Sequence, residues 1–154
     1  QNQIWTCNNF KIKKGRFLTS GGMGTMGYSI PCAIGAKLAD MSSEVIAICG
    51  DGSFQMQMME LATIVQENLP VKIIIMRNNR LGMVRELQTN KYEDNQVAVH
   101  LKGSPDFVAL AKAYGIPAER VSSKEEADEA VRHIVSCDGP YLIECNVYKY
   151  ETSL

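Results

Sequence analysis

The sequence lacks three features that would place it in special classes of protein. No apolar run approaches the roughly 20 residues needed to cross a bilayer, and no signal peptide opens the chain. The formal net charge is only −1, which provides no electrostatic basis for binding nucleic acid or an anionic membrane. The five cysteines form no C-x-x-C pair, so reduced thiols in a cytoplasmic protein are favoured over a zinc site or a disulfide framework.

The length and composition suit one globular domain that spans residues 1–154. Of these residues 45% are hydrophobic and 21% are charged, which is ordinary for a globular protein. There is no internal repeat and no low-complexity segment, and residues 1–20 are of mixed character. The chain opens with Gln1 rather than methionine, so we expect it to be a piece of a longer protein.

Strands and helices are predicted to alternate along the chain. Continuous apolar runs predict strands at 44–49, 71–76, 117–121 and 141–147. Apolar residues at helical spacing predict helices at 28–40, 54–67, 81–92, 104–115 and 122–136, with Ser104 as the cap of the fourth. Strands that are apolar on both faces and alternate with helices are typical of a parallel sheet covered by helices. We therefore predict a three-layer α/β fold, with a mostly parallel sheet and helices on both faces.

Polar residues follow two of these strands at the point where each ends. The segment GDGS at 50–53 follows the first strand, and RNNR at 77–80 follows the second. Ligands of open parallel sheets bind at the carboxyl ends of the strands. If the two strands are neighbours, Asp51 and an asparagine face one point beyond the sheet. Carboxylate, amide and carbonyl oxygens are hard donors, which suit Mg²⁺ or Ca²⁺ rather than zinc.

The glycines and the serine around Asp51 indicate a phosphate group beside this metal. Gly52 and Ser53 open the helix that follows, where backbone N–H groups favour an anion, and glycine lets the ligand approach closely. The alternative is that Asp51 only caps this helix, because Asp, Gly and Ser are all common at caps. The asparagine turn after the next strand favours the metal–diphosphate interpretation.

The same residues resemble a known family. Gly-Asp-Gly followed by Asn78 looks like the signature of thiamine-diphosphate enzymes. Longer segments are similar to the C-terminal cofactor domain of the acetolactate synthase large subunit, over nearly the whole chain: LTSGGMGTMGYSIPCAIGAKLA, GDGSFQM, ELATIVQENLPVKIIIM, LGMVRE and PDFVALAKAYGI. The resemblance implies the thiamine-diphosphate-binding fold, and it implies that the chain is the C-terminal part of a longer enzyme.

The resemblance implies a metal site and a diphosphate site. Asp51 and Asn78 would ligate Mg²⁺ through their side chains and Arg80 through its carbonyl, with Asn79 as the alternative amide. The N–H groups of two residues, Gly52 and Ser53, would hold the diphosphate. The family segment that contacts the same diphosphate resembles the opening of this chain, at Gln1 and Asn2.

The resemblance also implies contacts to the rings of thiamine diphosphate. Gly24 and the carbonyl of Met26 would meet the aminopyrimidine, while Gly82 and Met83 would pack near the diphosphate and the thiazolium. The family decarboxylates pyruvate and condenses the product with a second 2-keto acid, in branched-chain amino acid or acetoin synthesis. Many members have tryptophan where Leu87 stands, which puts 2-ketobutyrate as second substrate in doubt.

No catalytic residue is expected within this chain. The activating glutamate of the family belongs to an N-terminal domain, normally of a partner subunit, and FAD binds a middle domain where it is present. Glu60, Glu67 and Glu86 lie on polar helix faces and are expected to be solvated. The isolated chain is therefore expected to be inactive, while its parent enzyme forms a homo-oligomer with a possible regulatory small subunit.

Three other interpretations remain open from the sequence. A decarboxylase of another 2-keto acid would use the same metal site. Gly22-x-Gly24-x-x-Gly27, with Glu44 at about the right distance, fits the fingerprint of a dinucleotide-binding module, although a lone fingerprint is weak. An assembly domain without any ligand is the third.

Overall fold

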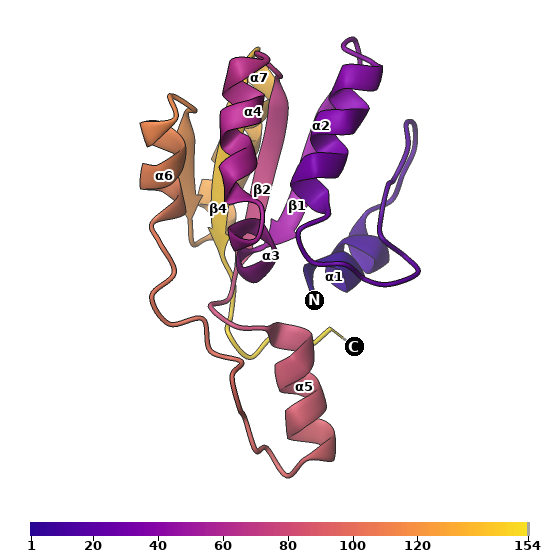
Figure 1. The fold of residues 1–154 in the computed structure, drawn as a ribbon, viewed down its shortest axis with the longest axis vertical. Coiled ribbons are helices and arrows are strands. Elements are labelled where there is room, and N and C mark those ends of the chain that lie inside the picture. Colours follow the sequence, from indigo (N-terminus) through magenta and orange to yellow (C-terminus); the bar gives the residue numbers. More distant parts are fainter. Residues whose placement is uncertain (154) are drawn as a thin grey trace.

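The computed structural model describes residues 1–153, which contain one parallel sheet. Within these residues four strands lie in the order β1-β2-β4-β3. Their bounds are β1 Val45–Gly50, β2 Val71–Arg77, β3 Ala118–Val121 and β4 Tyr141–Asn146. All neighbouring strands are parallel, so the predicted α/β fold is confirmed, and β1 lies beside β2 as the site hypothesis requires (Figure 1).

Helices cover both faces of the sheet. One face carries α2 (Ser29–Ala39), α3 (Asp51–Gln55), α4 (Leu61–Gln66) and α6 (Phe107–Ala113), while α7 (Lys124–Ser136) packs on the other (Figure 1). Two helices lie beyond the carboxyl ends of the strands, namely α1 (Asn2–Asn9) and α5 (Gly82–Lys91). Within residues 1–153 no helix combines the length and the apolar character that crossing a membrane requires.

The central strand β2 is buried on both faces, which explains its continuous apolar sequence. Ile73 and Ile75 join the larger core, where the fully buried rings of Phe54 and Phe107 meet edge to face with centroids 5.1 Å apart. Ile74 points to the opposite face and packs with the smaller core under α7. The larger core thus packs residues of both β1 and β2, while the smaller core packs β2, β3 and β4 against α7.

The predicted helix at 54–67 is interrupted, so that part of the prediction was wrong. The chain forms α3, bends at Met56 and Gln57, passes through a 3₁₀ turn (η1, Met58–Glu60) and continues as α4. Gly27 approaches the bend so closely that an added Cβ would lie 3.1 Å from Gln57 Cγ. The apolar spacing does not reveal the break, because both segments bury their apolar side chains in the same core.

The cap of α6 is Asp106 and not Ser104 as predicted. Asp106 Oδ1 accepts a hydrogen bond of 3.0 Å from the N–H of Ala109, and the same carboxylate pairs with Arg120 at 2.9 Å. Serine and aspartate are similarly good caps, so the local sequence could not choose between them. The ion pair with β3 favours Asp106, while the Ser104 hydroxyl accepts from Gln55 Nε2 at 3.1 Å.

The helix α1 was not predicted from the mixed sequence of residues 1–20. None of its side chains is buried, and polar contacts with distant parts of the chain hold it in place. Trp5 Nε1 donates to the carbonyl of Thr152 at 2.7 Å, and Asn2 Nδ2 lies 3.5 Å from the carbonyl of Ile48. The position of α1 therefore depends on tertiary contacts rather than on helix propensity.

The cap of α7 provides a test of the fold. Ser123 Oγ accepts from the N–H of Glu126 at 3.2 Å, so Ser123→Ala should lower the free energy of unfolding by about 1 kcal/mol. Glycine is tolerated at this position, so Ser123→Gly should cost only about a few tenths of a kcal/mol. Urea unfolding followed by circular dichroism measures both, and equal losses would argue against the cap.

Candidate functional site

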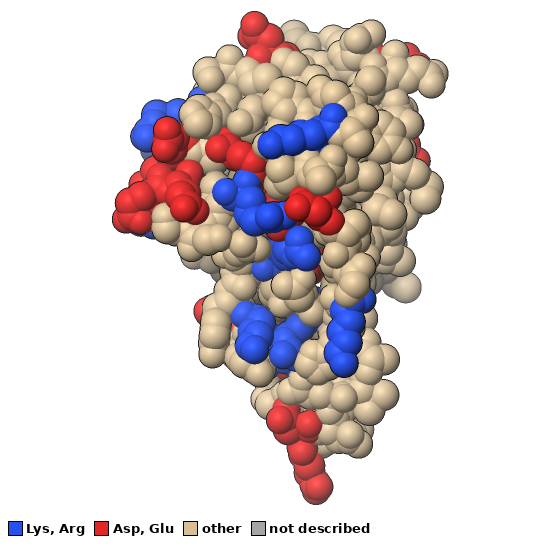
Figure 2. All heavy atoms as spheres, turned by 90° about the vertical axis from the view of Figure 1, so that its left-hand side faces the viewer, with Lys and Arg blue, Asp and Glu red and all other residues tan. Residues whose placement is uncertain are grey.

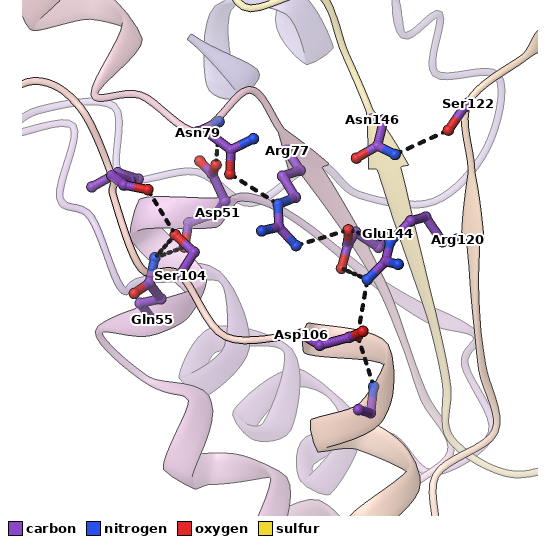
Figure 3. A network of polar contacts seen from close by, with 12 residues as sticks. Asp51, Gln55, Arg77, Asn79, Ser104, Asp106, Arg120, Ser122, Glu144 and Asn146 are labelled. Carbon is purple, nitrogen blue, oxygen red and sulfur yellow. Dashed lines mark hydrogen bonds and ion pairs between the residues drawn. The ribbon is translucent and has the colours of Figure 1, made fainter.

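Asp51 joins the ends of β1 and β2. Its side chain is buried, with the residue only 2% exposed. Oδ1 accepts from the N–H of Gly52 at 2.9 Å, and Oδ2 accepts from the N–H of Asn79 at 2.6 Å (Figure 3). Because β1 and β2 pair in parallel up to Gly50 and Met76, the turns that follow them lie side by side, as the sequence predicted.

The charge of Asp51 is only partly compensated by the protein. Burial raises the pKa of this carboxyl, while the N–H groups of Asn79 and Gly52 and the positive charge of Arg77 act in the opposite direction without cancelling the increase. A cation placed against the carboxylate would remove this penalty. The N-cap of α3 is Gly50, without a side-chain cap bond, so the alternative of Asp51 as a simple helix cap is not supported.

The two asparagines that follow β2 point in different directions. Asn78 is 6% exposed, and its Nδ2 donates to Gln1 Oε1 at 2.8 Å, while its Oδ1 accepts from the N–H of Arg80 at 3.0 Å. Asn79 has a positive φ of 57°, and its Oδ1 accepts from Arg77 Nε at 3.0 Å (Figure 3). The side chain of Asn78 thus lies toward the N-terminal residues, and that of Asn79 toward the opposite flank of β2.

The backbone of Arg80 forms a short bridge with His100. Its two hydrogen bonds run from Leu81 N–H to the Val99 carbonyl, at 2.8 Å, and from Leu101 N–H to the Asn79 carbonyl, at 3.0 Å. These bonds use the carbonyl of Asn79 and leave that of Arg80 out of the bridge. The bridge fixes the turn in which two of the three predicted metal ligands, Asn78 and Arg80, lie.

Gly52 sits in a tight apolar enclosure. A Cβ added there would lie 3.1 Å from Leu81 Cδ2 and Met26 Cε, and 3.2 Å from Leu101 Cδ1. A side chain at this position would have to displace these neighbours, so the close approach explains the glycine. The predicted cofactor residues Gly52 and Met26 are therefore brought together.

Ser53 connects the glycine-rich loop to α3. Its hydroxyl accepts from the N–H of Gly27 at 2.8 Å. Within the same loop the N–H of Gly24, which has a φ of 59°, donates to the carbonyl of Ser20 at 2.7 Å. These bonds hold the loop, with Gly24 and Met26, against the segment that follows β1.

The side chains of Gln1 and Asn2 lie close to Gly82 and Gly50, respectively. A Cβ added to Gly82 would overlap the side-chain amide of Gln1, and one added to Gly50 would lie 3.2 Å from Asn2 Oδ1. Gln1 also reaches Asn78, so the N-terminal residues meet both strand-end turns. Met83 follows Gly82 on α5 and is half exposed.

Glu86 is a residue whose role the sequence did not indicate. Its side chain is only 13% exposed, so the expectation of a solvated carboxylate was wrong. It accepts from the Gln1 amide and, at 2.7 Å, from the N–H of Ser153. Glu86 therefore positions Gln1 and holds the C-terminal residues over α5. No sequence signal points to it, because its partners lie at the two ends of the chain.

The alternative of a dinucleotide site at Gly22, Gly24 and Gly27 is not supported. That fingerprint requires a strand directly before the glycines. Residues 10–20 contain no strand, so this requirement is not met.

The donor set around Asp51 restricts the kind of metal that could bind. Among residues 1–153 no cluster of three or more His, Cys, Asp or Glu side chains could hold a metal ion. The candidate ligands contain one carboxylate, that of Asp51, with an amide and a carbonyl as neighbours. Such a set suits Mg²⁺, which commonly takes one or two carboxylates, water and phosphate oxygens.

Comparison with known proteins identifies the family. Residues 1–145 match the family described as the thiamine pyrophosphate enzyme, C-terminal TPP binding domain. The probable acetolactate synthase large subunit of Methanococcus aeolicus is 48% identical over 145 residues, which cover 94% of this chain and 24% of that protein.

Two further relatives carry similar names. The acetolactate synthase large subunit of Cyanidium caldarium is 44% identical, covering 96% of this chain and 25% of that protein. The acetolactate synthase isozyme 2 large subunit of Escherichia coli is 37% identical, and the match covers 98% of this chain and 28% of that protein. The chain spans about a quarter of the length of these relatives. It belongs to the family of C-terminal thiamine pyrophosphate-binding domains, and its resemblance to acetolactate synthase large subunits is confirmed.

Proposed function

We propose that this chain is the cofactor-binding domain of an acetolactate synthase and that it holds thiamine diphosphate through Mg²⁺. The observation that carries the proposal is the buried carboxylate of Asp51, which is bonded to the turn after β2 in a chain of this family. The parent enzyme would decarboxylate pyruvate and condense the product with a second 2-keto acid, for branched-chain amino acid or acetoin synthesis.

The metal would bind between the two strand ends. Asp51 and Asn78 would contribute side-chain oxygens and Arg80 its carbonyl, while diphosphate and water would supply the other ligands. The hydrogen bond from Arg77 to Asn79 Oδ1 draws that amide toward the opposite flank of β2. This contact supports Asn78 over Asn79 as the ligand.

The diphosphate and the rings would lie along the surrounding segments. Gly52 and Ser53 would hold the diphosphate through their N–H groups, beside Gln1 and Asn2. The glycine-rich loop would place Gly24 and the Met26 carbonyl at the aminopyrimidine. The start of α5 would place Gly82 and Met83 near the diphosphate and the thiazolium. The Ser53–Gly27 hydrogen bond supports this arrangement, because it holds two of these segments together.

The residues of this chain would bind and orient the cofactor rather than transfer protons. Thiamine diphosphate supplies the electron sink for cleavage of the carbon–carbon bond when it is bound. Gln1, fixed by Glu86 and Asn78, and the C-terminal residues 151–153 would help to exclude water from the diphosphate end. The activating glutamate would come from another part of the parent enzyme.

Other properties of the parent enzyme extend the proposal. Residues 1–154 would be one domain of a longer cytoplasmic homo-oligomer with a possible regulatory small subunit, and any FAD would bind outside this chain. The length of the relatives supports only the part of this view that makes the chain one domain of a longer protein. Leu87, which stands where many family members have tryptophan, is 47% exposed on α5. A different 2-keto acid decarboxylase remains the alternative activity.

Replacing Asp51 by its neutral isostere tests the metal site. Titration calorimetry of the 154-residue chain should show weak binding of thiamine diphosphate that requires Mg²⁺. Asp51→Asn should reduce the affinity on the order of 100-fold, because the single carboxylate of the site is lost. The matched control is Asp138→Asn, which alters an exposed aspartate and should bind normally. Binding that is independent of Mg²⁺, or equal in both variants, would contradict the proposal.

The choice between the two asparagines is tested by a pair of substitutions. Asn78→Ala should reduce Mg²⁺-dependent binding about tenfold or more, because an amide ligand is removed. Asn79→Gly should have a much smaller effect, since glycine accepts the positive φ of this position and preserves the turn. The same calorimetry measures both. A larger loss in Asn79→Gly would make Asn79 the ligand.

A further inference from the structure

A pocket lies on the opposite flank of β2 from Asp51. It has a volume of about 490 Å³ and opens between the ends of β2 and β4. Three segments line it: the turn at 77–80, residues 100–102 and residues 146–149. Its volume falls within the range of about 300–1,000 Å³ that is typical of small-molecule sites.

Among residues 1–153, the lining of the pocket contains cationic side chains and no carboxylate. Four residues carry this charge, namely Arg77, Arg80, Lys102 and Lys149. Arg77 forms an ion pair with Glu144, but the other three have no carboxylate partner among the residues that the structure describes. An excess of positive charge is therefore concentrated here, in a chain whose net charge is −1.

The arginines beside the pocket are balanced by carboxylates, so the excess of positive charge is confined to the pocket. Glu144 is fully buried in β4, with Arg77 at 3.0 Å and Arg120 at 2.7 Å (Figure 3). Asp106 also pairs with Arg120. Two arginines and two carboxylates thus balance one another beside the pocket. Figure 2 shows Lys and Arg side chains along the middle of this face of the molecule, with acidic side chains beside the upper ones and at the lower tip.

Arg80 is held in place by partners that leave its charge uncompensated. Its guanidinium carbon lies 4.8 Å from the centroid of the Tyr150 ring, and Nη1 donates to Gln96 Oε1 at 3.2 Å. Nη1 also lies 3.4 Å from His100 Nε2. Lys149 Nζ is 5.0 Å from the same tyrosine ring. A guanidinium that is already oriented loses less freedom when it binds an anion.

We propose that this pocket binds a small organic anion that carries more than one negative charge, as phosphate or as several carboxylates. Both groups accept paired hydrogen bonds from a guanidinium and ion pairs from ammonium groups. The side-chain amide of Asn146 in the lining, which uses one N–H for Ser122 Oγ, has a second N–H that can donate to the same oxygens. The pocket and the candidate metal site share the turn at 77–80, but the cationic groups of Arg80, Lys102 and Lys149 on which the proposal rests make no proposed contact with thiamine diphosphate.

Nuclear magnetic resonance can locate the anion directly. Inorganic phosphate and succinate are titrated separately into the ¹⁵N-labelled 154-residue chain at constant low ionic strength. We expect saturable shifts of the amide signals of residues 100–102 and 146–149. Shifts with phosphate alone indicate a phosphorylated ligand, and shifts with both probes indicate a general site for multivalent oxyanions; either result supports the pocket.

Charge-removing variants provide the control. Lys102→Gln with Lys149→Gln should weaken binding roughly tenfold, because two exposed cations of the pocket are lost. Lys91→Gln with Lys112→Gln changes the net charge equally at exposed positions outside the pocket and should leave the affinity unchanged. Equal weakening in both pairs, shifts that do not saturate, or shifts confined to residues 50–53 would overturn the proposal.

Discussion

The hydrogen bond from the N–H of Asn79 to Asp51 Oδ2 determines the geometry of the whole strand-end region. It closes the gap between two turns that follow neighbouring strands. The left-handed conformation of Asn79 directs its N–H to Asp51 and its carbonyl to Leu101. Without this bond the buried carboxylate would lose one of its two backbone donors, and the cost of its burial would rise. The candidate metal ligands are therefore arranged by the backbone before any ion arrives.

The same turn is held from the other side by a chain of charged groups. Asn79 accepts from Arg77, Arg77 pairs with Glu144, and Glu144 pairs with Arg120 on β3. Because Glu144 is fully buried, removing either arginine would leave its charge poorly compensated. The position of Asn79 thus depends on β4 and β3, which contribute no residue to the proposed cofactor site.

The features of the fold that depend on local sequence pattern and on the geometry of parallel sheets could be predicted from the sequence. The apolar runs gave the four strands, and the rule for parallel sheets brought Asp51 to the asparagine turn. The contact of Gln1 with Glu86 could not be predicted, because it joins distant parts of the chain and leaves no periodic signal. The cap of α6 also depended on a distant partner, Arg120, rather than on local preference. Sequence reasoning thus brought the two strand-end turns together but missed the contacts that hold them.

Because β2 lies between β1 and β4, the turn that follows it has two flanks, and these carry charges of opposite sign. One flank presents the buried carboxylate of Asp51, and the other presents Arg80, Lys102 and Lys149, which have no carboxylate partner among residues 1–153. A cation is favoured on the first flank and an anion on the second, and charges of opposite sign on the two sides of one turn attract. A cation alone on the first flank and an anion on the second would strengthen each other's binding by the same factor, because coupling between two sites is reciprocal. This coupling would weaken as salt is added, in contrast to a coupling transmitted by packing alone.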